Sequence, residues 1–361
     1  MRVRRLACLL CLVAGCGGGG LEAQGTVQTG GGSQSLVFAA LGQKGAPPDV
    51  AAISAARGVV EVMTEDGGPW SMVGSFFAGG NADQIVSGQI DGQGAVAVKD
   101  QNGTVTVLDS VAAMPHRLGD PIQIYRRVRN GQPLDDTPPA HRIALGDLDG
   151  DGSDELLASS ALGLVVVVDL KTLLAANPEH PLPGDGFRYD AGPEPGALTA
   201  VDLDGDGRLD VALLDAKEPA AYLYFNHGGP GHLDAPVEVD LPSVGVAVAA
   251  TGCASAPAAV VLADGHLALL SSDGKVKAAA AAVTDAKQLA SSRQALAVTS
   301  DSAAGVALLD SCAHFGARIK LPGASALDVA LTASGAIGRN ELAVLGGDGQ
   351  TVSLFGLLSG F

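Results

Sequence analysis

Two short acidic segments, nearly identical in sequence, constrain this chain more than any other feature. The first reads DLDGDGSDE over 147–155, and the second reads DLDGDGRLD over 202–210. In both, acids occupy positions 1, 3, 5 and 9, and glycines occupy positions 4 and 6. Carboxylates this close repel one another strongly unless a cation lies among them. Calcium takes about six to eight oxygen ligands in a flexible shell, so each segment predicts a calcium site.

Helical calcium loops of the EF-hand type do not fit these segments. Such a loop needs an acid at position 12, where Ala158 and Leu213 stand here. The flanking residues form short apolar runs, RIAL and LLAS around the first segment and LTAV and VALL around the second. Runs of this length are typical of buried strands. The sequence therefore predicts a strand, a calcium loop and a second strand in each copy.

The pattern Asp-x-Asp-Gly-Asp-Gly-x-x-Asp/Glu between strands resembles the FG-GAP or VCBS repeat of integrin alpha-subunit propellers and of bacterial surface proteins. The resemblance is specific over 140–240, and it implies an all-β β-propeller with integrin-type calcium loops in two blades. In such loops position 7 usually offers a backbone carbonyl, and Glu155 departs from the usual aspartate at position 9. The implied metal ligands are Asp147, Asp149, Asp151, Ser153 and Glu155 in the first loop, and Asp202, Asp204, Asp206, Arg208 and Asp210 in the second.

Degenerate copies of this unit predict further blades, because a single blade cannot bury both of its faces. Residues 87–98 and 331–342 align without gaps on the first loop and its flanks. The ligand positions hold Gln89, Asp91, Gln93 and Ala97 in the former, and only Glu341 is retained in the latter. With three further segments of similar rhythm we expect seven blades, and six or eight also fit. Residues 35–41 are expected to close the ring by joining the sheet that contains 351–358.

The N-terminus predicts export and a lipid anchor. Residues 1–15 begin with three arginines, continue with an apolar run and end on small residues, as a secretory signal does. The stretch Val13-Ala14-Gly15-Cys16 resembles the bacterial lipobox, which implies lipidation of Cys16; plain secretion is the alternative. Residues 16–34 are glycine-rich and are expected to form a flexible tether before a propeller over 35–361. By the same resemblance, an aspartate directly after the cysteine implies retention in the inner membrane, so Gly17 implies the outer membrane or cell surface instead.

The remaining candidate features are less specific. Cys253 and Cys312 either pair in an oxidising compartment or lie separately in the core. A formal net charge of −17 argues against nucleic acid as a partner. The sequence contains neither a His-Glu-x-x-His zinc motif nor a Gly-x-Ser-x-Gly elbow. Trp70, the only tryptophan, is interpreted as a packing residue, with a sugar-stacking platform as the alternative.

Together these features favour a lipid-anchored, calcium-stabilised propeller that acts as a scaffold or binding module for a protein or glycan in the cell envelope. The calcium ions are expected to stabilise the fold without taking part in chemistry. The alternative is a propeller-type envelope enzyme, such as a quinoprotein, a lyase or a glycan-cleaving enzyme, because this fold hosts both classes. An aromatic content of 4% favours a protein partner over a glycan.

Overall fold

The computed structural model describes most of the chain downstream of residue 20. The described ranges are 21–41, 48–65, 69–111, 114–117, 122–123, 128–129, 132–133, 140–160, 163–176, 186–228, 232–251, 253–271, 273–278, 286–291, 295–300, 306–310, 319–320, 326–333 and 340–357. The predicted signal peptide 1–15, the predicted lipidation site Cys16 and the thiol of Cys312 lie outside them. No helix within these ranges is long and apolar enough to cross a membrane.

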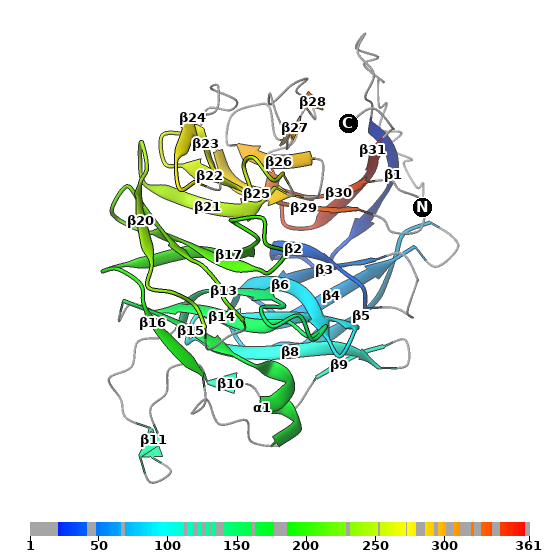
Figure 1. The fold of residues 1–361 in the computed structure, drawn as a ribbon. Coiled ribbons are helices and arrows are strands. Elements are labelled where there is room, and N and C mark those ends of the chain that lie inside the picture. The colour runs from blue at the N-terminus through cyan, green and yellow to red at the C-terminus, as the bar shows by residue number, and fades with distance from the viewer. Residues whose placement is uncertain are drawn as a thin grey trace, which may run out of the picture.

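The described residues form antiparallel sheets, each built mostly from strands that follow one another in sequence (Figure 1). The first three sheets contain β2 (Ser33–Ala39), β3 (Asp49–Ser54), β4 (Val59–Thr64) and β5 (Ser71–Phe77); β6 (Ala82–Ile90), β7 (Gln93–Asp100) and β8 (Thr104–Val111), which pairs with both β9 (Met114–Arg117) and β10 (Ile122–Gln123); and β13 (Ala140–Gly146), β14 (Glu155–Ser160), β15 (Leu164–Val168) and β16 (Phe187–Asp190). The helix α1 (Leu170–Ala176) connects β15 to β16, and β11 (Val128–Arg129) pairs with β12 (Gln132–Pro133).

Four more sheets follow the same plan. They contain β17 (Pro195–Val201), β18 (Asp210–Asp215), β19 (Ala220–Tyr224) and β20 (Val237–Asp240); β21 (Gly245–Ala250), β22 (Ala258–Leu262), β23 (Leu267–Leu270) and β24 (Val276–Ala278); β25 (Ala286–Ser291), β26 (Ala295–Ser300), β27 (Val306–Asp310) and β28 (Ile319–Lys320); and β29 (Ala326–Ala333), β30 (Asn340–Gly346), β31 (Thr351–Leu357) and β1 (Leu21–Gln28).

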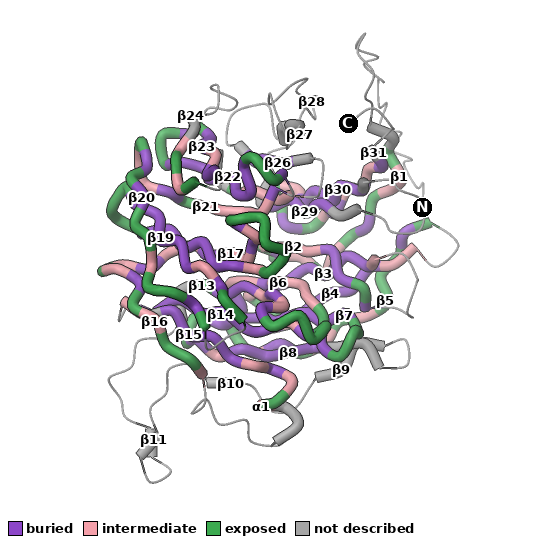
Figure 2. Tube along the Cα trace, in the orientation of Figure 1, coloured by how far each residue is buried: buried purple, intermediate pink, exposed green. Residues whose placement is uncertain are grey.

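The first strands of successive sheets contact one another in a closed cycle. The order of contact is β2, β6, β13, β17, β21, β25 and β29, and β29 in turn contacts β2. Middle strands such as β14, β18 and β22 are buried along their whole length, whereas many of the outer strands and connecting turns are exposed (Figure 2). Each sheet is therefore covered on both faces by its neighbours, as the short apolar runs in the sequence predict.

The ring is closed by a different strand from the one expected. The segment 35–41 lies largely in β2, the first strand of its own sheet, and does not join the sheet of β31. Instead β1 pairs with β31, from Leu21↔Leu357 to Gln28↔Thr351 (Figure 1). The tether predicted over 16–34 is therefore wrong for 21–28, because the alternating residues of LEAQGTVQ supply the outer strand that the last sheet lacks. Among them Val27 is buried in the core.

A register shift recurs where each first strand begins. It separates Ser33 from Ser35 in β2 and Ala82 from Gln84 in β6, and corresponding shifts occur in β13, β17, β21, β25 and β29. A bulge re-aims the side chain that follows it. Gln84 thereby exchanges two hydrogen bonds of 2.8 Å with the backbone of Ile143 in the next sheet.

The packing assigned to Trp70 is confirmed. Its side chain is 6% exposed and lies in a cluster with Val27, Leu36 and Leu354, between the sheet of β1 and β31 and the sheet of β2 to β5. Elsewhere the sheets meet through small aliphatic side chains, with Ala, Val and Leu making up most of each cluster. Small side chains allow neighbouring sheets to approach closely.

Candidate metal centre

Both acidic segments form loops at the same place in neighbouring sheets. The first connects β13 to β14, and the second connects β17 to β18. The flanking strands are antiparallel partners, so a helical EF-hand is excluded, as the sequence predicted. The glycines at positions 4 and 6 have positive φ, namely 77° and 86° in the first loop and 83° and 89° in the second. Only glycine adopts this backbone readily, and it allows the loop to coil around its own carboxylates.

In the first loop the acids are organised around Asp147. Its Oδ1 accepts hydrogen bonds from the amides of Gly150 (2.7 Å) and Asp151 (3.1 Å), and its Oδ2 accepts one from Gly152 (3.0 Å). One carboxylate oxygen each from Asp147, Asp149 and Asp151 lies within 4.8 Å of the others. Three of the predicted ligands are thus brought together.

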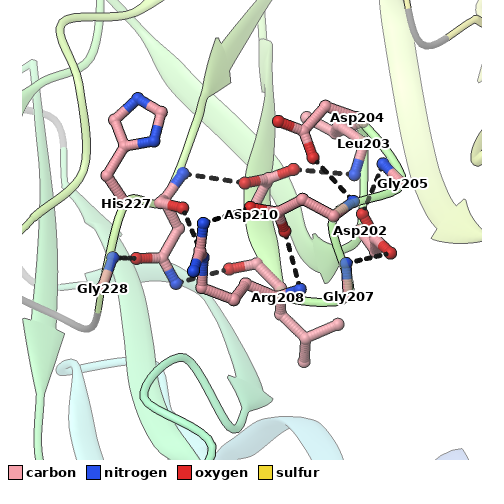
Figure 3. Close-up of polar contacts among 12 residues, drawn as sticks. Asp202, Leu203, Asp204, Gly205, Gly207, Arg208, Asp210, His227 and Gly228 are labelled. Carbon is pink, nitrogen blue, oxygen red and sulfur yellow. Dashed lines mark hydrogen bonds and ion pairs between the residues drawn. The ribbon is translucent and has the colours of Figure 1, made fainter.

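The second loop has the same backbone pattern with a different set of acids (Figure 3). Asp202 accepts hydrogen bonds from the amides of Gly205 (2.7 Å) and Gly207 (3.1 Å). Here the oxygens within 4.8 Å of one another belong to Asp202, Asp204 and Asp210. The predicted ligand at position 9 therefore joins the group in this loop, and the predicted ligand at position 5, Asp206, does not.

The acids at position 9 are buried, and each accepts a hydrogen bond from the backbone amide at position 2 of its loop. Glu155 Oε2 accepts a hydrogen bond from the Leu148 amide at 2.7 Å, and Asp210 Oδ2 accepts the equivalent bond from Leu203 at 2.7 Å. Burial, and to a lesser degree the negative charge of Asp149, raises the pKa of Glu155 to about 8. Glu155 lies outside the first oxygen group, which is consistent with its being a departure from the usual aspartate.

Two basic side chains neutralise part of the charge, and no pattern in the sequence predicts either role. Lys171 in α1 places its ammonium 2.9 Å from Asp151 Oδ2 and 3.1 Å from Asp91 Oδ1. The guanidinium of Arg208 lies 2.5 Å from Asp206 Oδ2, so the observed role of Arg208 is a side-chain ion pair, whereas the role predicted for its carbonyl stays a prediction. The position-5 carboxylates thus already have cationic partners within the chain.

The first loop is also fastened to the preceding sheet. Asp154 and Gln89 exchange two hydrogen bonds, from the Asp154 amide to the Gln89 carbonyl (2.7 Å) and from the Gln89 amide to Asp154 Oδ2 (2.9 Å). The predicted position-7 residue Ser153 uses its Oγ to accept the amide of Asp91 at 2.8 Å. Burial raises the pKa of Asp154 to about 6. This loop is therefore a joint between two sheets.

Asn226 fastens the two acidic loops to each other. Its side-chain Nδ2 donates to the carbonyl of Leu148 in the first loop (2.6 Å) and to the carbonyl of Leu209 in the second (2.9 Å). Its backbone amide donates to Asp210 Oδ1 at 2.8 Å. Asn226 is 1% exposed, so these bonds are shielded from water.

The donor set fits a hard divalent cation. Every convergent atom is a carboxylate oxygen, which suits calcium or magnesium better than softer metals. Burial raises the pKa of Asp149, and the charges of Asp151 and Asp147 raise it further; a bound cation would relieve that repulsion. Calcium itself stays a prediction.

The degenerate copies differ in how well they match the predicted alignment. In 331–342, Thr332 pairs with Glu341 as Gly146 pairs with Glu155, so the gapless alignment holds there. In 87–98 the strands join through a two-residue turn, Asp91-Gly92, and Gly88 pairs with Ala95. The position of Glu155 therefore corresponds to Ala95 rather than Ala97, because this turn is two residues shorter.

Of the two cysteines in the predicted pair, Cys253 lies in the part of the chain that the structure describes. Cys253 is buried, and its Sγ lies 3.6 Å from Ser255 Oγ. Since Cys312 lies outside the described residues, the disulfide and the two separate thiols both stay open as predictions.

Comparisons with known proteins identify the fold. No protein-family model and no curated protein matches the chain. A structure of BBS1N in complex with ARL6DN, soaked with lead, matches 93% of this chain and 94% of its own, with 11% identity and a TM-score of 0.64. The mercury-soaked structure of the same complex gives 12% identity over 94% and 95% of the two chains, with a TM-score of 0.59. The chain is a β-propeller.

A third similar structure is PorZ, a bacterial surface component of the type-IX secretion system of Porphyromonas gingivalis. It matches 92% of this chain with 13% identity and a TM-score of 0.54, and the match spans 37% of the PorZ chain. Identities this low concern the fold alone. The propeller predicted from the acidic loops is thus confirmed, whereas the FG-GAP or VCBS assignment stays a resemblance.

Proposed function

We propose that this chain is an exported, lipid-anchored propeller that binds a protein partner in the bacterial cell envelope. The observation that carries the binding role is the outer strand β5, which exposes Met72 (36%), Val73 (43%) and Phe77 (67%) to solvent. Exposed apolar side chains gathered on one element mark interaction sites more often than isolated ones do. The outer strands β1, β9, β16, β20, β24 and β28 each contain a charged residue, which discourages edge association, and β5 contains none.

The similar structures support this role by analogy. BBS1N was solved in complex with ARL6DN, and PorZ is described as a bacterial surface component. A protein partner fits the exposed Met72, Val73 and Phe77 of β5 better than a glycan does, since carbohydrate sites pair aromatic faces with polar groups and the other members of this exposed set are apolar. The lipobox-like stretch ending at Cys16, followed by Gly17, supports attachment to the outer membrane or the cell surface.

The number of blades and the calcium loops are part of the same proposal. Each of the seven sheets that contact one another cyclically is one blade, so the propeller has seven blades. Two of these blades carry FG-GAP-type loops that bind one calcium ion each. Asp147, Asp149 and Asp151 hold the first ion, and Asp202, Asp204 and Asp210 hold the second. The ions stabilise the joints between blades and take no part in chemistry.

Capture of the partner tests the binding role. The full chain carrying Phe77→Lys is compared with wild type after chemical cross-linking in the native envelope and purification. The matched control is Val237→Lys, which alters a 46% exposed residue of the charged outer strand β20. We expect one protein to be enriched with wild type and with Val237→Lys. Its yield should fall at least tenfold with Phe77→Lys, and the purified protein should bind the purified wild-type chain again. Equal capture by all three chains would refute the assignment to β5.

Calcium is tested separately by unfolding experiments. Calcium at about 100 times its Kd should raise the free energy of unfolding by about 2.7 kcal/mol for each independent site, relative to excess chelator. Asp204→Asn should remove the part of this calcium-dependent stabilisation that comes from the second loop. The control Gln93→Ala changes an exposed residue at the start of β7, outside both acidic loops, and should leave the calcium response intact. Identical unfolding curves with calcium and with chelator would exclude the sites.

Lipidation is tested by metabolic labelling with an alkyne fatty acid. Wild type should carry the label and sediment with membranes, and Cys16→Ser should lose the label and leave the membrane fraction. A labelled Cys16→Ser chain would show that the lipid is attached elsewhere.

A further inference from the structure

The two acidic loops are joined by a short path of buried hydrogen bonds. The path begins at Asp210, a member of the second oxygen group, whose Oδ1 accepts the backbone amide of Asn226. It continues from Asn226 Nδ2 to the carbonyl of Leu148 at 2.6 Å. Leu148 is the residue between Asp147 and Asp149, both members of the first oxygen group. One side chain therefore connects a candidate ligand of one loop to the backbone between two candidate ligands of the other.

Every member of this path is shielded from water. Asp210, Asn226 and Leu148 are each 1% exposed, and so is Glu155, which accepts the Leu148 amide at 2.7 Å. Leu148 is thus held on both of its peptide groups, by Glu155 on one side and by Asn226 on the other. A change in the orientation of this backbone segment must break one of these bonds or move the group that makes it. Breaking a buried bond leaves a polar group unsatisfied, which is strongly unfavourable.

We infer that the two loops bind their cations with positive cooperativity, and that Asn226 transmits the coupling. This inference rests on the proposed calcium sites. When the first loop is ordered around a cation, the Leu148 carbonyl is fixed and holds Asn226 Nδ2 in place. The Asn226 amide then holds Asp210 in the orientation that places it beside Asp202 and Asp204. The second loop consequently loses less conformational entropy when its own cation binds, which is the thermodynamic basis of cooperativity.

The size of the coupling can be measured with variants in which only one loop is weakened. Asp149→Asn weakens the first loop without touching the path, and Asp204→Asn does the same in the second, because neither residue bonds to Asn226 or Leu148. Calcium binding to the intact loop of each variant gives its affinity with the other loop empty. In wild type the second calcium ion binds to its loop while the other loop is already filled. The ratio of the two affinities is the coupling factor, and it must be the same in both directions.

The experiment measures calcium binding to the full chain by isothermal titration calorimetry. In an otherwise wild-type chain, each loop should bind at least about fivefold more tightly when the other is filled. In an Asn226→Ala background this ratio should fall to one. The matched control is Asn102→Ala, an exposed asparagine in the turn between β7 and β8, which should leave the ratio unchanged.

A second measurement avoids dependence on the folding of Asn226→Ala. In Asp149→Asn, calcium occupies only the second loop, and amide hydrogen exchange is followed in the first. Exchange at Leu148 and Gly150 should slow at least tenfold on addition of calcium. Unchanged exchange would refute the coupling, as would independent binding with a ratio of one in the wild-type chain, and both outcomes leave two calcium sites in place. No calcium binding to wild type would instead refute the sites and the coupling together.

Discussion

The closure of the ring makes folding stability depend on pH through one buried carboxyl. Asp328 in β29 accepts hydrogen bonds from Ser35 Oγ (2.6 Å) and from the Leu36 amide (2.9 Å), both in β2. It also accepts the Val329 amide at 2.9 Å. This carboxyl therefore joins the last sheet to the first, at the same joint that Trp70 packs. Burial raises its pKa to about 6, and these three donors only partly offset the effect.

The direction of the pH dependence follows from that raised pKa. Well below pH 4 the carboxyl is protonated in both the folded and the unfolded chain, so it imposes no penalty on folding. As the pH rises from 4 through 6, the unfolded chain releases the proton while the folded chain retains it. Each unit of pKa difference corresponds to about 1.36 kcal/mol, so the Asp328 contribution falls by about 2.4 kcal/mol between pH 4 and pH 7.

Urea unfolding of wild type and Asp328→Asn, measured from pH 4 to pH 8, tests this reasoning. The amide does not titrate, so the difference in free energy of unfolding between the two chains should change by about 2.4 kcal/mol across the range. Asp264→Asn is the control, because Asp264 is half-exposed and the His266 amide lowers its pKa, which confines its effect to acidic pH. A wild-type and Asp328→Asn difference that stays constant within about 0.5 kcal/mol would refute the argument.

Three substitutions test the packing between sheets and use thermal or urea unfolding as the measurement. A Cβ on Gly94 would lie 2.1 Å from the carbonyl oxygen of Ala40, so Gly94→Ala should destabilise by more than about 2 kcal/mol, whereas Gly80→Ala, with open space around it, should change stability by less than about 1 kcal/mol. Tyr224→Phe removes a buried hydroxyl that donates to a backbone carbonyl at 2.5 Å and should cost about 1–2 kcal/mol. Gln84→Ala removes both bonds to the next first strand and should cost about 1–3 kcal/mol; a neutral result would mean that water replaces the amide.

The local features of the fold could be predicted because the residues that determine them are adjacent in the sequence. The acidic loops, their glycines and the strands around them occupy about fifteen residues each, and short-range chemistry decides their conformation. The absence of an acid at position 12, together with the short apolar runs around each loop, was enough to predict strands rather than helices on either side. The gapless alignment of 331–342 succeeded for the same reason, since Glu341 occupies the register position of Glu155.

The joints between sheets could not be predicted, because their partners are far apart in the sequence. Asn226 lies 78 residues from Leu148, and nothing in the sequence FNHGG marks it as a link between loops. Lys171 reaches Asp91 and Asp151 only because α1 follows β15 directly. The closing strand was missed because LEAQGTVQ is polar and glycine-containing, and its role depends on β31 having a free edge at the other end of the chain.

The positions of the acidic loops suggest why only some blades need them. Adjacent sheets contact chiefly through their first strands, so the loop after each first strand lies where two blades meet. Around the turn at Asp91-Gly92, a short turn and hydrogen bonds to 152–154 fasten the joint without a cluster of charge. The longer loops at 147–154 and 202–209 carry several carboxylates at that joint, and Asn226 links the pair. A cation would therefore act at the boundary between the third and fourth sheets, so chelation should loosen this boundary before the closure at Asp328, a sequence of events that hydrogen exchange can resolve.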